Sequence, residues 1–204
     1  MKKNIILVGA GTHANSCIDV IELEKKYKIF GLIDNERKKK VGEYKIIGKD
    51  KDLKKIRKKV DYALVTVGLI NNPKIRENLF KLIKKLKFKT PSIISPLAHV
   101  SKSASVGGGT IVFHNTIVNS NSCIGKNCII NNRALIEHDV NIGDGCHIST
   151  GAIINGNCNI GKNTFVGSGA IVSNNINILK NSFIKLGQRI IKDLNDEKRK
   201  REKK

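Results

Sequence analysis

The chain has 204 residues, of which 40% are apolar and 4% aromatic, and its formal net charge is +21. No stretch approaches the roughly 18–20 consecutive apolar residues of a transmembrane helix, so we expect no membrane insertion and a cytoplasmic protein. The basic residues are scattered through loops and a terminal tail, without an aromatic stacking platform or a DNA-reading motif. Nucleic acid is therefore not an expected partner.

Residues 1–90 alternate predicted strands and helices. An apolar strand at residues 4–8 runs into the turn GAGTH at residues 9–13, and residues 15–25 then have helical spacing. A strand, a glycine-containing turn and a helix N-terminus form an anion-binding arrangement, because free backbone N–H groups and the helix dipole face the turn. Asn15 stands near the place where a dinucleotide fingerprint has a further glycine, so this motif is weak on its own.

Asp34 ends the second predicted strand, residues 28–34, at the edge where open α/β sheets collect ligand-binding groups. Further predicted strands and helices follow at residues 44–47, 51–59, 61–68 and 74–86. Asn71, Asn72 and Pro73 mark the start of the last helix, whose outer face is expected to be basic. Residues 1–90 are thus predicted to form a small parallel, Rossmann-like α/β domain.

From residue 93 to residue 194 the chain repeats a six-residue pattern without interruption. The second place of every unit is Ile or Val, from Ile94 to Ile190, and the sixth place is mostly small. This pattern describes a short strand and a tight corner, with the aliphatic and the small residue both turned inward. Three such strands make a coil of 3 × 6 = 18 residues, so residues eighteen apart are predicted to lie about 4.8 Å above one another.

The repeat resembles that of the hexapeptide-repeat acyltransferases, which implies a left-handed parallel β-helix over residues 91–194. A charged tail, residues 195–204, follows and is expected to be disordered. An α/β domain with GxGxH after its first strand and an Asp at the end of its second, followed by such a β-helix, looks like a particular bacterial family. It resembles the nucleotide-aminosugar N-acetyltransferases and sialic acid O-acetyltransferases of the PglD/NeuD type.

The resemblance implies a homotrimer that uses acetyl-CoA as co-substrate and holds a nucleotide-linked amino sugar in its first domain. It implies that this sugar is contacted by Gly9, Gly11, His13 and Asp34.

Acetyl transfer to an amine requires a base for the attacking nitrogen, and histidine suits that role at neutral pH. The segment LIEHDV places His138 between Glu137 and Asp139, which matches a catalytic His followed by an acidic residue in the family. The match implies His138 as general base and Asp139 as the carboxylate that orients it. A corner histidine bonded only to backbone is the alternative reading of His138.

His147 and Gly156 are the predicted cofactor contacts. His147 matches a family histidine that contacts the acetyl carbonyl of acetyl-CoA, and Gly156 lies one coil above His138, because 138 + 18 = 156. His147 follows His138 by nine residues, half of an eighteen-residue coil, so the two are predicted on different sides of one prism. They can serve one site only if a second subunit brings them together, which favours an interfacial site in a closed oligomer.

The leading hypothesis is an acetyl-CoA-dependent N-acetyltransferase for the amine of a UDP- or dTDP-linked 4-amino-deoxy sugar in surface glycan biosynthesis. O-acetylation of a sialic acid is a rival within the same chemistry, and a non-enzymatic basic scaffold is a distant one. No metal site is expected, because the sequence has neither a CxxC pair nor a histidine cluster with metal-ligand spacing. Zinc carbonic anhydrases share this repeat, but the spacings between His114, His138 and His147 do not match theirs.

Overall fold

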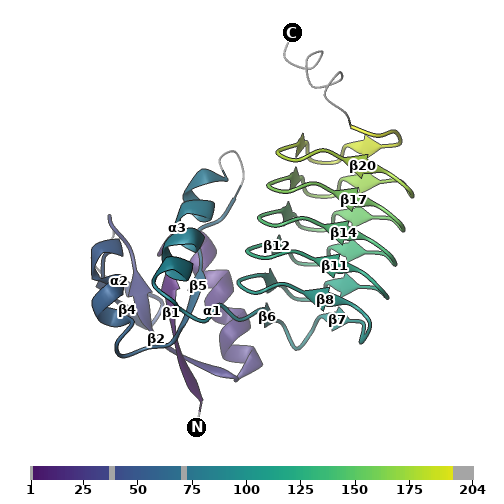
Figure 1. The fold of residues 1–204 in the computed structure, drawn as a ribbon. Helices are drawn as coiled ribbons and strands as arrows, with labels where there is room; N and C mark the ends of the chain where they lie inside the picture. The colour runs from purple at the N-terminus through teal and green to yellow at the C-terminus, as the bar shows by residue number, and fades with distance from the viewer. Residues whose placement is uncertain (1, 37–39, 70–72, 195–204) are drawn as a thin grey trace.

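The computed structural model describes residues 2–36, 40–69 and 73–194. An α/β unit stands beside a triangular column of stacked coils (Figure 1). Asn71 and Asn72 of the predicted helix start lie outside the described residues, as does the tail at 195–204 that is predicted to be disordered. No helix in the described ranges is long and apolar enough to cross a membrane.

The α/β unit is built on a five-stranded sheet in the order β3-β4-β2-β1-β5. Its strands are β1 (Lys3–Val8), β2 (Tyr27–Ile33), β3 (Lys40–Val41), β4 (Tyr44–Gly48) and β5 (Tyr62–Val65). The prediction of a parallel sheet is right for four strands and wrong for β3, which runs antiparallel to β4. The chain reverses there in a tight turn in which Gly42 has a φ of 55°.

Helices cover both faces of this sheet. They are α1 (Thr12–Glu24), α2 (Leu53–Ile56), preceded by a 3-10 turn at Asp50–Asp52, and α3 (Lys74–Lys85). Alternate residues of β1 point to opposite layers, because Ile5 packs with α1 and Ile6 packs with α2 and α3. Pro73 is the N-cap residue of α3, in agreement with the predicted start of that helix.

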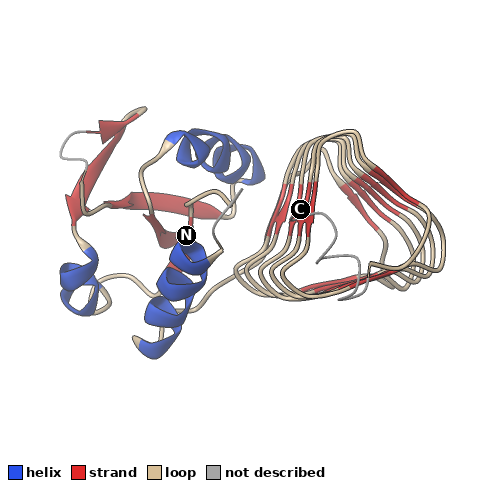
Figure 2. Cartoon of the chain, turned by 90° about the horizontal axis from the view of Figure 1, so that it is seen from above, coloured by secondary structure: helices blue, strands red, loops and turns tan. Residues whose placement is uncertain are grey.

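The column consists of two-residue strands that form three flat faces (Figure 2). Face 1 comprises β6 (Ile93–Ile94), β9 (Ile111–Val112), β12 (Ile129–Ile130), β15 (His147–Ile148), β18 (Phe165–Val166) and β21 (Phe183–Ile184). Face 2 comprises β7 (His99–Val100), β10 (Ile117–Val118), β13 (Leu135–Ile136), β16 (Ile153–Ile154), β19 (Ile171–Val172) and β22 (Arg189–Ile190). Face 3 comprises β8 (Ser105–Val106), β11 (Cys123–Ile124), β14 (Asn141–Ile142), β17 (Asn159–Ile160) and β20 (Asn177–Ile178).

Each strand pairs in parallel with the strand eighteen residues away, so the predicted frame is confirmed. On face 3, for example, Ile142 pairs with Ile124 below and with Ile160 above. These side chains are 3%, 4% and 2% exposed, and they form one inward column of the apolar core. Burial of such columns is what a single coil cannot achieve alone, so the coils stabilise one another by stacking.

The α/β unit packs against the lower part of face 1. The first residues of β6, β9 and β12 are Ile93, Ile111 and Ile129, and all three are fully buried in one cluster with α1. His114 bridges the two units. Its Nδ1 lies 2.7 Å from Oγ of Ser95, and its Nε2 lies 2.7 Å from Oδ2 of Asp19 in α1. Higher on face 1 the outward side chains remain available to line a cavity.

We expect Ile142→Asp to abolish soluble protein, because it places an unpaired carboxylate in the apolar column. The expected cost exceeds ~4 kcal/mol, as for other uncompensated buried charges. Soluble yield and circular dichroism melting measure the effect. Asn141→Asp is the matched control, because Asn141 is the exposed neighbour on the same strand. Equal yields of the two variants would contradict the inward assignment of Ile142.

Candidate active site

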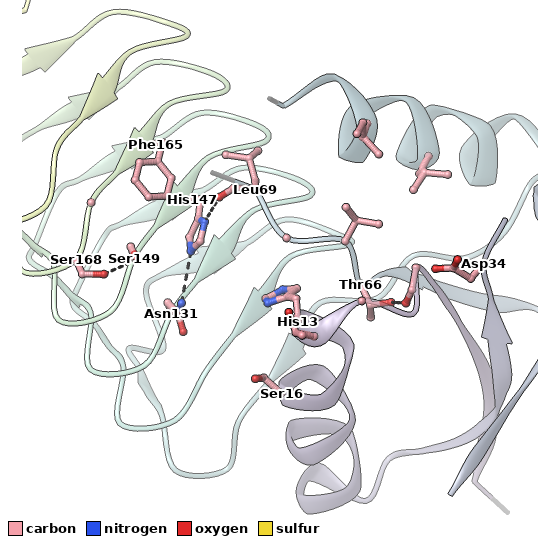
Figure 3. Close-up of a pocket in the computed structure, with 18 of the residues that line it drawn as sticks. His13, Ser16, Asp34, Thr66, Leu69, Asn131, His147, Ser149, Phe165 and Ser168 are labelled. Atoms are coloured by element: carbon pink, nitrogen blue, oxygen red, sulfur yellow. Dashed lines mark hydrogen bonds between the residues drawn. The ribbon is translucent and has the colours of Figure 1, made fainter. Parts of the chain in front are cut away.

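A cavity of about 1150 Å³ opens between the α/β unit and the upper part of face 1. Four predicted substrate contacts, Gly9, Gly11, His13 and Asp34, line one wall. The opposite wall carries His147 and Phe165 (Figure 3). Phe183, one coil above Phe165, also lines the cavity. The structure thus brings five of the eight predicted site residues to one cavity.

The two glycines of the turn serve different purposes. Gly9 has a φ of 110°, and a Cβ there would lie 2.4 Å from Cγ2 of Val67, so only glycine fits against the end of β5. Gly11 is the N-cap of α1 and makes no side-chain cap hydrogen bond. Apart from its two chain neighbours, no described residue comes within 4 Å of a Cβ built there. The first turn of α1 has no acidic residue. This helix terminus therefore presents its positive dipole end to the cavity, which favours an anion.

Asp34 follows β2 directly and joins that strand to the turn. Its Oδ2 accepts the Ala10 N–H at 2.7 Å, and its Oδ1 accepts the Glu36 N–H at 3.0 Å. The carboxylate lies at the sheet edge where the sequence predicts it, lines the cavity, and also fixes the shape of the turn.

His13, in the first turn of α1, is held against the β-helix. Its ring centroid lies 5.6 Å from that of Phe113. Burial, and then the positive charge of Arg76, lower the pKa of His13 to about 3, so the imidazole is neutral at pH 7. Its Nε2 is buried and has no hydrogen-bond partner among the described residues. A buried polar atom of this kind requires a partner, and a ligand in the cavity can provide one.

His147 is the first residue of β15, and its side chain points toward the α/β unit. The side chain is 6% exposed, and its Nδ1 contacts the carbonyl oxygen of Leu69. Burial lowers the pKa of His147 to about 4, although the bond to Leu69 acts in the opposite direction. The ring centroids of His147 and Phe165 lie 5.1 Å apart in a T-shaped arrangement. The rings of Phe165 and Phe183 are stacked, with their centroids 4.9 Å apart.

Sequence reasoning missed this aromatic wall, although the signal was present. Residues one and two coils above His147 are at 147 + 18 = 165 and 165 + 18 = 183, and both are Phe. Both Phe residues stand at the first place of their repeat unit, where side chains point outward. The sequence therefore predicts that they stack above His147 on face 1.

Arg76 was also missed, and it is the one basic residue of α3 that is buried. It is 1% exposed, and its Nη1 donates to the Val65 and Val67 carbonyls at 2.8 and 2.7 Å. Its Nε donates to the carbonyl of Asn127, in the β-helix, at 3.1 Å. Burial lowers the Arg76 pKa to about 10, so the guanidinium stays charged at pH 7 and ties the two cavity walls together.

The remaining predicted residues form a second group at the vertex between faces 2 and 3. His138 Nδ1 lies 2.8 Å from Oδ2 of Asp139, and this bond lowers the pKa of the Asp139 carboxyl. Glu137 instead accepts a hydrogen bond from Asn119 at 2.8 Å, so Asp139 is the partner of the imidazole. A Cβ at Gly156 would lie 2.7 and 2.8 Å from Cε1 and Nε2 of His138, so glycine leaves space for the ring itself.

The vertex between faces 2 and 3 lies opposite face 1 in the triangular cross-section (Figure 2). His138 and Asp139 of one chain therefore cannot reach the cavity that His147 of the same chain lines. The sequence-based expectation that the two histidines lie on different sides of the prism agrees with this geometry.

Solved structures with this architecture include acetyltransferases. The acetyltransferase domain of PglB from Neisseria gonorrhoeae, in complex with acetyl coenzyme A, has a TM-score of 0.90 and 26% identity, covering 96% of this chain and 94% of that chain. PerB from Caulobacter crescentus, in complex with CoA and GDP-perosamine, has a TM-score of 0.88 and 25% identity, covering 94% and 90%. WeeI from Acinetobacter baumannii, at 22% identity, 92% and 96% coverage and a TM-score of 0.72, shares the fold. A comparison with curated proteins found no match.

The family model of the PglD N-terminal domain matches residues 4–83. The N-terminal domain of this chain thus matches that of the PglD family, and the whole chain shares its fold with the acetyltransferase domain of PglB. The predicted fold class, an α/β domain followed by a left-handed β-helix, is confirmed with it. Gly9, Gly11, His13 and Asp34 share a cavity with His147, while His138 and Asp139 stand at the opposite vertex.

We expect the stability of this protein to fall as the pH falls from about 6.5 to about 4. The folded chain keeps His147 and His13 neutral down to pKa values of about 4 and 3, whereas the unfolded chain binds protons near pH 6.5. More protons bind to the unfolded state in this window, so the free energy of unfolding decreases by up to ~1.4 kcal/mol per pH unit for each histidine.

Urea unfolding at fixed protein concentration, at pH 7, 6 and 5, measures this slope. The double variant His13→Gln with His147→Gln should show a shallower pH dependence than the wild type. Equal slopes in the two proteins would mean that these histidines are not the groups responsible.

Proposed function

We propose that this chain is an N-acetyltransferase that moves the acetyl group of acetyl-CoA to the amine of a nucleotide-linked amino sugar. The observation that supports this most is the cavity itself, which joins the anion-binding turn of the α/β unit to His147 on the β-helix. The comparison structures support the same chemistry, since PerB holds CoA and GDP-perosamine and the PglB domain holds acetyl coenzyme A. The finer proposal is a UDP- or dTDP-linked 4-amino-deoxy sugar of surface glycan biosynthesis.

The α/β wall has the groups that a sugar nucleotide requires. The N-terminus of α1 at Gly11 offers backbone N–H groups and a positive dipole end to the diphosphate. His13 contributes Nε2, which has no partner among the described side chains, and Asp34 stands where a ribose or base can be reached. The formal net charge of +21 also favours the approach of an anionic substrate.

The proposed chemistry places His138 as base. Its Nδ1 is bonded to the Asp139 carboxylate, which leaves Nε2 to take a proton. As the amine nitrogen bonds to the acetyl carbon, His138 Nε2 accepts the proton of the amine, and the C–S bond breaks to release CoA. Asp139 orients the ring and stabilises the imidazolium that forms. His147 and Gly156 are the proposed cofactor contacts.

The proposed assembly is a homotrimer in which one copy's His138 meets another copy's cavity. The outward column of face 2 contains Ile117, which is 41% exposed, with half-buried Leu135, Ile153 and Ile171 above it. The outward column of face 3 is polar, with Asn141, Asn159 and Asn177 joined by hydrogen bonds. We propose face 2 as the contact between copies, because an exposed aliphatic column typically marks an interface. Acetyl-CoA is a cytoplasmic metabolite, so we propose that the protein works in the cytoplasm.

His138→Ala should remove nearly all transfer activity without lowering the melting temperature, because the side chain is 55% exposed at a vertex. Asp139→Asn should be milder and should keep the fold, since asparagine tolerates the φ of 60° at this position. Steady-state kinetics across pH measures both effects. If His138→Ala retains more than about a tenth of kcat, the activation free energy has risen by less than ~1.4 kcal/mol. Such a small increase would contradict the role of His138 as an essential base.

Mixed oligomers test whether the site is shared between copies. Co-expression of His138→Ala with His147→Ala should restore part of the activity, because some sites then combine an intact His138 from one copy with an intact His147 from another. Each variant alone serves as its own control. If a confirmed mixed oligomer recovers no activity, the proposal that one site combines His138 of one copy with His147 of another is wrong.

Nucleotide binding tests the acceptor class. Calorimetric titration with UDP, dTDP or GDP, without acetyl-CoA, should show binding to the wild type. Asp34→Ala should weaken it because the turn loses the acceptor of the Ala10 N–H, while acetyl-CoA affinity persists. Asp34→Asn, which keeps one acceptor oxygen, should lie between the two.

Asp61→Ala is the matched control for Asp34→Ala, because Asp61 is an exposed carboxylate that pairs with Arg57 away from the cavity. No nucleotide binding at millimolar concentration, together with acetylation of free sialic acid, would overturn the proposal in favour of an O-acetyltransferase. Salt-dependent binding of nucleic acid without binding of acetyl-CoA would instead favour a basic scaffold.

A further inference from the structure

The imidazole of His147 is bounded on both sides by groups of the protein (Figure 3). Nδ1 contacts the carbonyl oxygen of Leu69, and Nε2 lies 3.5 Å from Nδ2 of Asn131. Phe165 packs against the ring with an interplanar angle of 87°. The ring is therefore held in one orientation, with Nε2 on the side of the cavity wall that Asn131 and Phe165 share.

The partner of Nδ1 determines the position of the proton. A backbone carbonyl oxygen can only accept a hydrogen bond, so Nδ1 of His147 must carry the hydrogen. A neutral imidazole has a single N–H, which leaves a lone pair on Nε2.

The bonds on the other side lead to the same assignment. Oδ1 of Asn131 accepts the N–H of Asn132 at 2.8 Å, so the Asn131 amide turns its NH₂ group toward His147. An NH₂ group donates, and Nε2 must therefore accept. Burial lowers the pKa of His147 to about 4, which agrees with a neutral ring at pH 7.

We infer that His147 acts toward the cavity as a hydrogen-bond acceptor through Nε2, and that the ligand group it binds is an N–H. The contact of 3.5 Å with Asn131 is long for a hydrogen bond, so a ligand N–H can take the lone pair at a shorter distance. A thioester carbonyl has lone pairs only and cannot bond to Nε2 of the neutral ring.

The identity of the ligand rests on the proposed function, which supplies two N–H sources. One is an amide N–H of the pantetheine arm of acetyl-CoA, and the other is the amine of the sugar. In both cases His147 orients a substrate and leaves removal of the amine proton to His138 of another copy.

The tautomer can be measured in the free protein without an activity assay. In protein labelled with ¹⁵N at histidine, long-range proton–nitrogen spectra distinguish protonated from unprotonated ring nitrogens, and the signals lost in His147→Asn assign the residue. We expect a protonated Nδ1 and an unprotonated Nε2 at pH 7. A hydrogen on Nε2, or a doubly protonated ring, would overturn the inference.

Ligand additions separate the two sources. Coenzyme A alone offers pantetheine amides, whereas a UDP- or GDP-linked 4-amino-deoxy sugar alone offers the amine. The ligand that supplies the N–H should move the Nε2 signal toward lower frequency. If calorimetry shows that both ligands bind and neither moves this signal, the inference is wrong and the proposed function stands. If neither ligand binds, the proposed function fails and the assigned ligand fails with it.

Two variants of His147 separate the roles of its nitrogens. The amide of His147→Asn reaches about the place of Nδ1 and can keep the bond to Leu69, whereas that of His147→Gln reaches about the place of Nε2 and can offer an acceptor oxygen. We expect His147→Asn to raise the KM of the N–H-bearing substrate roughly two- to tenfold, the loss of one hydrogen bond. His147→Gln should stay closer to wild type. Equal changes in KM for both substrates in both variants would indicate a structural role alone.

Discussion

The parallel hydrogen bonds between successive coils are the constraint on which the arrangement of the β-helix depends. The Asn157 N–H, for example, donates to the His138 carbonyl at 3.0 Å, and the His147 N–H donates to Thr164 at 2.9 Å. These bonds hold each residue above the one eighteen positions earlier, so a column of side chains has a fixed spacing along the axis. That spacing brings the His138 ring into contact with Gly156, and it brings Phe165 into contact with His147.

The cavity depends on a second contact, which fixes the α/β unit against face 1. Arg76 supplies hydrogen bonds to three carbonyls, two near the end of β5 and one in the β-helix. A buried charge is costly unless it is hydrogen-bonded, and here its bonds span the junction of the two units. His114 and Asp19 add a connection at α1. The Val67 carbonyl that Arg76 binds lies two residues before Leu69, whose carbonyl contacts His147.

Sequence reasoning predicted the β-helix well because its pattern is local and repeats with a constant period. The period alone places His138 and His147 on different sides and Gly156 next to His138. It could not predict the burial of Arg76, because that depends on packing between segments far apart in the chain. The same holds for Asp34: the sequence puts it at a strand end, but its bond to the Ala10 N–H depends on the close approach of β2 and the turn. Strand β3 escaped prediction because two residues carry almost no pattern.

The triangular cross-section restricts how the length of this chain can change. Insertion of six residues in the column would rotate every later coil by one face, so Phe165 and Phe183 would leave the cavity and join face 2. Insertion of a full eighteen residues would only lengthen the column and keep each side chain on its own face. Tolerated insertions and deletions within the repeat should therefore come in whole coils, and the depth of the aromatic wall above His147 can grow or shrink in steps of one coil without disturbing the turn below.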